Sequence, residues 1–194
     1  NDGLFLQYED RPGLMTKREI RIQLLAELEL PEAGVLWDIG AGVGSVGLEA
    51  LRIRPNLSLL AIEKRAGCIS LIKANAARLN VRPSAIIESD ALTLLKTQTG
   101  IPNELHAPNR VLLGGGGSDK ESLLKAIIQK IRPEGVIVIP LATLQAFSKT
   151  ESLLKGSGFR VEVSQHQPYR GIPLVRGTRL SPMNPILIVK GKLK

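Results

Sequence analysis

The sequence predicts an α/β fold built on a doubly wound, mostly parallel sheet of seven strands. Apolar runs of strand length alternate with segments of helical periodicity along almost the whole chain, and repeated strand–helix units fold into parallel sheets. The 194 residues suffice for one domain with a sizeable core. Because no internal repeat or long linker divides them, we expect residues 1–194 to form a single domain. The first residue is Asn rather than Met, which fits a natural protein that extends further upstream.

The first half of the chain is expected to hold three of the strands. Before them, Thr16 and Glu19 have the spacing of a capping box, so a helix is expected with Thr16 at its N-cap and its end before Pro31. The strands are expected at residues 35–39, 57–62 and 84–88, and the helices that follow them at residues 45–54, 66–79 and 91–96. Each strand segment is a short, mainly apolar run, whereas apolar residues recur every three or four positions in the helices.

The second half is expected to hold the other four strands. They lie at residues 110–113, 136–139, 160–167 and 186–189, with helices at 118–131 and 141–155 and a polar loop at 97–109. Residues 168–185 are rich in Gly, Pro and Arg and join the last two strands. This joint is too long for a hairpin turn, so we expect it to be a functional or interface segment.

The charge of the chain favours an anionic partner. The net charge is +8, and residues 160–194 carry seven basic side chains against one acidic. Nucleic acid is not the expected partner, because the three Phe, two Tyr and one Trp are scattered and base stacking needs clustered aromatics. A polycarboxylated small molecule would use the same basic residues without stacking.

Two further absences narrow the class of protein. The longest apolar, uncharged run, residues 135–148, contains Pro140 and is shorter than the roughly 18 residues that a membrane span needs, so no membrane partner is expected. The single cysteine, Cys68, rules out a disulfide scaffold and a cysteine-based metal cluster. We therefore expect an intracellular protein, located in the cytoplasm, without a metal site.

A glycine-rich turn follows the first expected strand and carries the strongest functional signal. Asp38 ends the strand, and Gly40-Ala41-Gly42-Val43-Gly44 leads into a helix. Such glycines allow a tight turn and a close approach of ligand to backbone. Glu63 ends the second strand, where an acidic residue accepts the two hydroxyls of a ribose. Asp90 and Ala91 follow the third strand, where an adenine would lie.

The ligand of this turn is expected to be cationic. Dinucleotide enzymes carry a glycine at the place of Ser45, and phosphate loops end in Gly-Lys-Ser/Thr, which the chain lacks. An acid directly before the glycines suits S-adenosylmethionine, whose amino-acid part Asp38 would hold directly or through water. The order of Asp38, the glycines, Glu63 and Asp90 resembles the class I S-adenosylmethionine methyltransferases. The alternative is a glycine turn that serves packing alone.

The loop after the fourth expected strand separates classes of methyltransferase. Enzymes that methylate exocyclic amino groups of bases carry (Asp/Asn)-Pro-Pro-aromatic there, whereas this chain has Gly114-Gly115-Gly116-Gly117. A glycine loop leaves room for a large, flat ligand, and its N–H groups would be available to carboxylates. The alternative is a flexible turn into the next helix.

Several segments together point to one family. Pro12-Gly13-Leu14-Met15-Thr16-Lys17, the four glycines, Arg170-Gly171, Arg176-Gly177-Thr178 and Asn184-Pro185 occur in this order. The combination resembles the C15-methylating, decarboxylating module of the precorrin-6Y C5,15-methyltransferases of cobalamin biosynthesis. The resemblance implies a Rossmann-like class I methyltransferase fold. It also implies methyl transfer from S-adenosylmethionine to carbon 15 of a precorrin, with loss of CO2 from the ring C acetate. The module occurs alone or fused behind a C5-methylating domain.

The resemblance also implies roles for individual residues. At or beside cofactor-binding positions fall Thr16, Asp38, Gly40, Ala41, Gly42, Val43, Gly44, Glu63, Asp90 and Ala91. Candidates for the substrate carboxylates are Gly114, Gly115, Gly116, Arg170, Arg176 and Arg179; the alternative for the arginines is an exposed interface loop. Glu63 stands where Asp is more usual, which lengthens its reach to the ribose. No general acid or base is assigned, because His106 lies in the 97–109 loop and His166 on a strand.

Assembly and two rival functions complete the expectations. The resembled family implies a homotetramer formed through residues 168–185, where Ile172, Leu174, Val175 and Leu180 have no obvious place in the core of one sheet. An RNA methyltransferase that acts on a base nitrogen, such as one for tRNA, would share the cofactor half of the site. A third possibility is a protein that binds the cofactor without catalysis.

Overall fold

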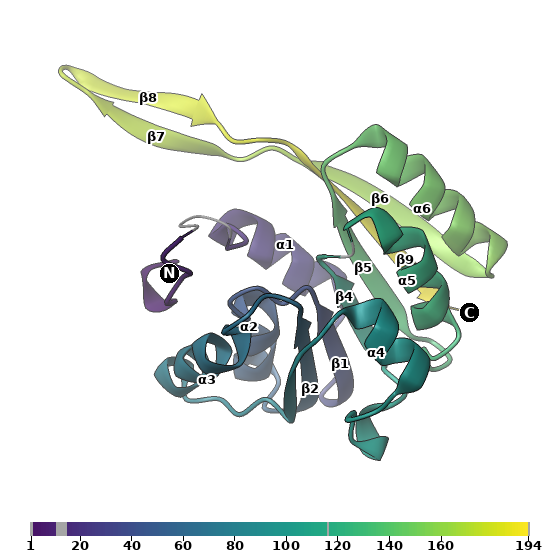
Figure 1. Ribbon diagram of the computed structural model, residues 1–194. Helices are drawn as coiled ribbons and strands as arrows, with labels where there is room; N and C mark the ends of the chain where they lie inside the picture. The colour runs from purple at the N-terminus through teal and green to yellow at the C-terminus, as the bar shows by residue number, and fades with distance from the viewer. Residues whose placement is uncertain (1, 11–14, 116, 194) are drawn as a thin grey trace.

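A seven-stranded sheet forms the centre of the molecule, with helices against both faces (Figure 1). The computed structural model describes residues 2–10, 15–115 and 117–193. Its strand order is β3-β2-β1-β4-β5-β9-β6. The sheet strands are β1 (Ala33–Ile39), β2 (Asn56–Glu63), β3 (Ala85–Glu88), β4 (Arg110–Leu113), β5 (Val136–Leu141), β6 (Phe159–His166) and β9 (Ile186–Leu193). Strands β1 to β5 pair in parallel, and β9 is antiparallel to both of its neighbours. The predicted fold class is confirmed.

The helices divide between the two faces of the sheet. They are α1 (Arg18–Glu27), α2 (Ser45–Ile53), α3 (Cys68–Leu79), α4 (Ala91–Thr97), α5 (Lys120–Ile128) and α6 (Leu144–Gly156), with 3-10 turns η1 (Asp2–Leu4), η2 (Asn103–Leu105) and η3 (Gly117–Asp119). Helices α1, α2 and α3 bury Leu24, Leu48 and Ile72 in one core cluster. Helices α4, α5 and α6 bury residues such as Leu95 and Leu154 in the other. Each fully buried side chain of this size stabilises the fold by about 1.5–3 kcal/mol.

The loops after β1 and β4 are tied together where the strand order reverses. The N–H groups of Gly114 and Gly115 both donate to the Ile39 carbonyl, at 2.9 and 3.1 Å. The N–H groups of Gly40 and Ala41 donate to the Ile62 carbonyl of β2, at 2.8 and 3.1 Å. The carboxyl ends of three strands therefore meet at one point, which is where α/β sheets of this kind bind ligands.

The start of α1 differs from the expected capping box. The N-cap is Lys17, whose carbonyl accepts the first helical hydrogen bonds and whose side chain makes no capping hydrogen bond. The Thr16 carbonyl accepts instead from Arg21 Nη1 at 2.7 Å. Glu19 binds Arg170 rather than reaching back to the helix start. The prediction of Thr16 as N-cap was wrong. The N-cap lies one residue later, and Glu19, the second member of the box, pairs with Arg170, 151 positions away in the chain.

Residues 168–185 are not a loop. They form a hairpin of β7 (Tyr169–Leu174) and β8 (Gly177–Pro182), which projects from the body of the molecule as an extension of β6 and β9 (Figure 1). The segment is longer than a hairpin turn, as expected, but the sequence did not predict that most of its residues are themselves paired strands around a two-residue turn. We call β7, β8 and this turn the arm.

Two helices begin later than expected. Strand β5 continues to Leu141, and α6 starts only after Thr143, whose Oγ1 accepts from the Ala146 N–H at 3.3 Å. The 3-10 turn η3 precedes α5. Among the residues that the structure describes, no helix is both long and apolar enough to cross a membrane.

Candidate active site

A pocket of about 660 Å³ opens where β1, β2 and β4 end, a volume typical of small-molecule sites. Most of the residues that the sequence predicts for the site line it. These are Thr16, Asp38, Gly40, Ala41, Gly42, Val43, Glu63, Asp90, Ala91, Gly114 and Gly115. Gly44 is not among the lining residues and forms the N-cap of α2. Gly116 and residues 12–14 of the quoted motif lie outside the described part of the chain.

The glycine-rich turn fits backbone conformations that other residues avoid. Gly40, Gly42 and Gly44 have φ angles of 75°, 58° and 79°, in the left-handed region that favours glycine. A Cβ on Gly40 would lie 2.5 Å from the Gly115 nitrogen, so the two glycine loops touch backbone to backbone. This contact keeps side chains out of the part of the pocket between the two glycine loops.

Glu63 is buried at the end of β2 and holds two neighbouring loops. Its Oε2 accepts from the Gly42 N–H at 2.9 Å, and its Oε1 accepts from the Arg65 N–H at 3.0 Å. Each carboxylate oxygen has a second lone pair. The side chain therefore faces the pocket with acceptor capacity left for a ligand.

Asp38 is the most deeply buried acid of the pocket. Its Oδ2 accepts from the Gly47 N–H at 3.0 Å. Burial, with a smaller contribution from the Glu63 charge, raises the pKa of Asp38 to about 7, although the Gly47 hydrogen bond opposes this shift. A Cβ on Gly47 would lie 2.8 Å from Oδ2, so glycine at 47 is what allows this contact. A cation in the pocket would favour the ionised form of Asp38.

Asp90 positions the loop after β3. It is the N-cap of α4, and its Oδ1 accepts from the Thr93 N–H at 2.9 Å and from the Thr93 hydroxyl at 3.0 Å. These hydrogen bonds hold the pKa of Asp90 below its usual value. Ala91, the first residue of the helix, is thereby fixed at the pocket edge.

The N-terminal residues form a wall of the pocket that the sequence did not reveal. Tyr8 lines it, with its hydroxyl 3.5 Å from the Gly42 carbonyl and the Arg65 guanidinium 4.9 Å from its ring. Burial raises the pKa of Tyr8 to about 12. Asn75, fully buried on α3, binds the N–H and the carbonyl of Leu6 at 2.7 and 3.1 Å, and the Val43 carbonyl at 3.0 Å. A polar residue on the otherwise apolar buried face of the helix was the available signal.

The opposite half of the pocket is mostly uncharged. It is lined by Leu112, Gly114, Gly115, Gly117, Asp119, Leu123, Pro140, Ala142 and Ile186. The N–H groups of Gly114 and Gly115 already donate within the fold. The sequence suggested that these N–H groups bind carboxylates, and this was wrong because they are already used. Without side chains, these two glycines instead allow a ligand to approach the backbone closely. This half suits a large ligand with flat, apolar faces.

Comparison with known proteins decides the family. The sequence model of one family, the precorrin methyltransferase domain, matches residues 7–190. The chain belongs to this family. It is 35% identical over 190 residues to the probable cobalt-precorrin-6B C(15)-methyltransferase (decarboxylating) of Pyrobaculum aerophilum, covering 97% of this chain and 92% of that protein. The resemblance seen in the sequence is thus confirmed, and the family implies S-adenosylmethionine as methyl donor.

Solved structures agree with this methyltransferase family. The precorrin-6Y C5,15-methyltransferase of Geobacter metallireducens has a TM-score of 0.84 and 29% identity, over 98% of this chain and 95% of that one. A precorrin-8W decarboxylase from Methanobacterium thermoautotrophicum has a TM-score of 0.82 and 26% identity, over 97% of each chain. A tRNA (m1A58) methyltransferase from Aquifex aeolicus is only 13% identical at a TM-score of 0.70, over 98% of this chain and 73% of that one, which shows the shared fold alone.

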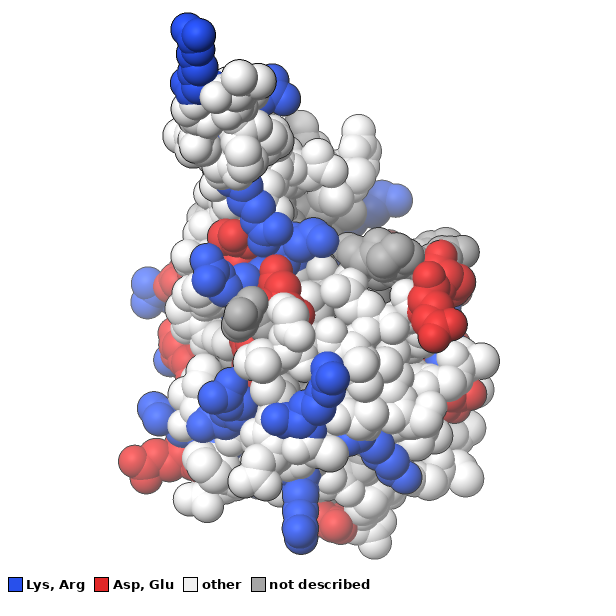
Figure 2. All heavy atoms as spheres, turned by 90° about the vertical axis from the view of Figure 1, so that its left-hand side faces the viewer, with Lys and Arg blue, Asp and Glu red and all other residues white. Residues whose placement is uncertain are grey.

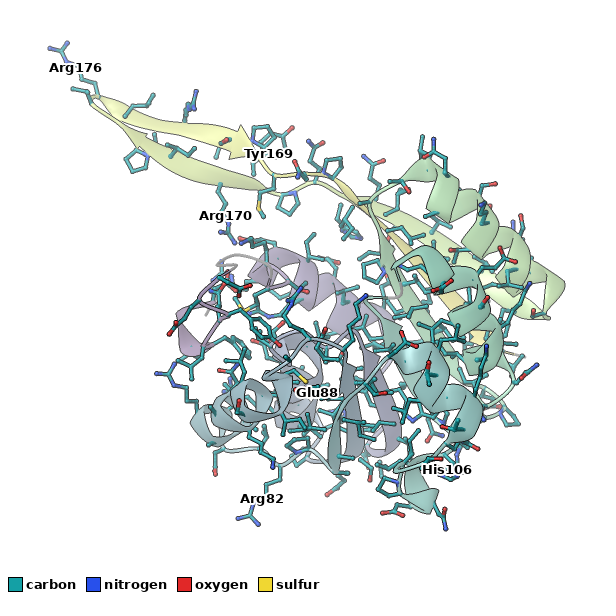
Figure 3. All side chains as sticks on the ribbon, in the orientation of Figure 1. Arg82, Glu88, His106, Tyr169, Arg170 and Arg176 are labelled. Carbon is teal, nitrogen blue, oxygen red and sulfur yellow. The ribbon has the colours of Figure 1, made fainter. Side chains whose placement is uncertain are left out.

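The arginines predicted for the substrate of this methyltransferase lie outside the pocket. Arg170, at the base of the arm, points toward α1 and binds Glu19, whereas Arg176 lies at the tip and points away (Figure 3). Arg179 is exposed on β8. Figure 2 shows basic side chains gathered around the base of the arm with acidic ones among them.

The histidines and the cysteine take structural positions in this family member. A ring nitrogen of His106 lies 2.9 Å from the Ile101 carbonyl, and one of His166 lies 2.9 Å from the Ser164 hydroxyl. Cys68 is buried at the start of α3. None of the three lines the pocket. Within the described residues, no group of three or more His, Cys, Asp or Glu could hold a metal ion.

Proposed function

We propose that the chain methylates carbon 15 of a precorrin of the precorrin-6Y type and removes CO2 from its ring C acetate, in cobalamin biosynthesis. The carrying observation is a pocket with two unlike halves. The acids and the glycine-rich turn line one half, together with Tyr8, Lys17, Lys64 and Arg65, and glycines with mainly apolar side chains line the other. A small cationic donor fits the first half, and a broad, flat acceptor fits the second. The family match over residues 7–190 supports the same assignment.

The residues of the first half suit S-adenosylmethionine, which supplies an electrophilic methyl group on a sulfonium. Glu63 would accept the ribose hydroxyls with its remaining lone pairs. Asp38 would face the amino-acid part, and Asp90 with Ala91 would border the adenine. A Cβ on Gly40 would collide with Gly115. Gly42 adopts a left-handed backbone conformation that strains other residues. Thr16 closes this side of the pocket from the start of α1.

The second half would hold the precursor and keep water away from it. Carbon 15 belongs to a conjugated macrocycle, which provides the electron density for attack, so a strong base is not required. The protein's part is to hold acceptor and methyl group in line and to exclude water. The close contact of Gly40 and Gly115 keeps this junction free of side chains.

The arm suits assembly into a homotetramer in the cytoplasm. Its exposed apolar side chains include Leu174, Val175 and Leu180, which are 55%, 103% and 71% exposed. Apolar side chains gathered on one projecting element are typical of a protein interface. In such an assembly the arms pack on one another, and Arg176 and Arg179 rim the active sites and meet substrate carboxylates bidentately. In an isolated chain these two arginines would remain exposed.

A substrate comparison tests the proposed function. The protein is incubated with labelled S-adenosylmethionine and either a precorrin-6 precursor or bulk tRNA, with Glu63→Ala as the control. Label in the precorrin that depends on Glu63 supports the proposal. Label in tRNA alone would instead support the base-nitrogen methyltransferase, and cofactor binding without transfer to either would support a binding protein.

A further inference from the structure

The first turn of α1 is held from two sides by charged groups. On the inner side, Arg21 is fully buried and donates to the Thr16 carbonyl at 2.7 Å and to Asp2 Oδ1 at 2.6 Å. Both oxygens of Glu49 accept from the same guanidinium at 3.1 Å. On the outer side, Glu19 faces the arm. The side chain of the N-cap residue, Lys17, makes no capping hydrogen bond, so these contacts hold the first turn of the helix.

The outer contact comes from the arm. Arg170 Nε and Nη2 donate to Glu19 Oε1 and Oε2 at 3.1 and 2.7 Å, a bidentate pair, and Nη2 also lies 3.4 Å from Asp2 Oδ2. Asp2 therefore stands between Arg170 and the buried Arg21. The Arg170 hydrogen bond also lowers the pKa of Glu19. Figure 3 shows the Arg170 side chain crossing from the arm toward α1.

The turn that these contacts hold is a wall of the pocket. Thr16, Lys17 and Ile20 all line it, and Glu19 lies between the last two. We propose that Arg170 is a positioning residue that couples the arm to the cofactor pocket through Glu19 and Asp2. A displacement of the arm then loosens this wall of the pocket. The affinity for the cofactor therefore depends on the position of the arm. The part of this inference that concerns the cofactor rests on the proposed function.

Two kinds of variant isolate the contact. Arg170→Ala removes both the bidentate hydrogen bonds and the charge, whereas Arg170→Lys keeps the charge without the bidentate geometry. Glu19→Gln removes the partner charge, and the Arg170→Ala/Glu19→Gln double variant completes a cycle. Arg179→Ala is the matched control, because it removes the same charge from the same arm and Arg179 has no ion pair among the described residues.

Two measurements on the full chain test the proposal. Amide hydrogen exchange of residues 15–24 is followed without ligand, and S-adenosylhomocysteine affinity is measured by calorimetry at low and high salt. Arg170→Ala should speed the exchange and weaken the affinity by about threefold to tenfold. Arg170→Lys should give an exchange rate and an affinity between those of Arg170→Ala and the wild type. The double variant should differ little from Arg170→Ala, and high salt should reduce the difference in affinity between Arg170→Ala and the wild type. Arg179→Ala should leave both readouts unchanged.

The outcomes separate this inference from the proposed function. Unchanged exchange in Arg170→Ala, or an equal effect of Arg179→Ala, would overturn the coupling. If the wild type binds no S-adenosylhomocysteine, the proposed cofactor is wrong, and the exchange comparison alone still decides whether the arm holds the wall. Circular dichroism and light scattering confirm that each variant is folded and assembled like the wild type; a variant that fails is replaced by Glu19→Gln in the same comparison.

Discussion

Glu63 and Asp38 lie in one pocket but in different environments. Glu63 is held by two backbone N–H groups, whereas Asp38 has a single N–H partner and full burial. The sequence indicated both because strand ends and glycine turns are local features. It did not indicate Asn75 or Tyr8, whose partners lie 69 and 34 positions away in the chain. Their place depended on how the N-terminal residues pack over α3.

Replacing Glu63 tests the ribose contact. Glu63→Ala should weaken S-adenosylmethionine binding at least tenfold, because hydrogen bonds to a charged group contribute roughly 1.5–3 kcal/mol each. Calorimetry measures the change, and Glu63→Asp is the matched control because it keeps the carboxylate and shortens its reach. An Ala variant that binds as tightly as the wild type would contradict the role of Glu63.

The ionisation of Asp38 predicts a pH dependence of stability. Its pKa is about 7 in the folded protein and near 3.8 when unfolded. Because the folded value is the higher one, the unionised carboxyl favours folding below pH 4, and this contribution is lost as the pH rises to about 7. The free energy of unfolding should fall by about 4 kcal/mol over this pH range. Urea unfolding from pH 4 to 8 should show it in the wild type and not in Asp38→Asn; parallel pH profiles would refute the assignment.

The strands and helices of the buried core were predictable from the sequence, and the arm was not. Short apolar runs located β1 and β2, and apolar periodicity located the helices, to within a few residues. Every residue of β7 is exposed, so the arm lacks the alternation that marks a half-buried strand. The same limit applies to α1, where the capping-box pattern was present but Glu19 pairs with Arg170, 151 positions away in the chain.

The contact between the β1 and β4 loops predicts unequal costs for two glycine substitutions. Gly42→Ala meets no atom within 4 Å and should cost about 1 kcal/mol for its left-handed backbone alone. Gly40→Ala adds a Cβ only 2.5 Å from Gly115, so it should destabilise the fold further and abolish cofactor binding. Denaturant unfolding and calorimetry compare the two. Equal losses of stability and of cofactor affinity in the two variants would mean that the β1 and β4 loops do not touch at Gly40 and Gly115.

The distribution of apolar surface over the whole molecule predicts how chains assemble. Replacing Leu174 and Val175 by Asp places charges on the arm, where the homotetramer contact is proposed. Light scattering should then report smaller species, with cofactor binding weakened only as far as Arg170 is displaced. A wild-type protein that runs as a monomer at micromolar concentration would refute the assembly.

The central claim is that one pocket joins methyl transfer to decarboxylation of a precorrin. Mass spectrometry of the tetrapyrrole after reaction with S-adenosylmethionine tests it most directly. The account predicts a product that has gained one methyl group and lost one CO2, in equal amounts and only with the cofactor present. An unaltered precorrin alongside methylated tRNA, or a methylated product that keeps every carboxylate, would contradict it.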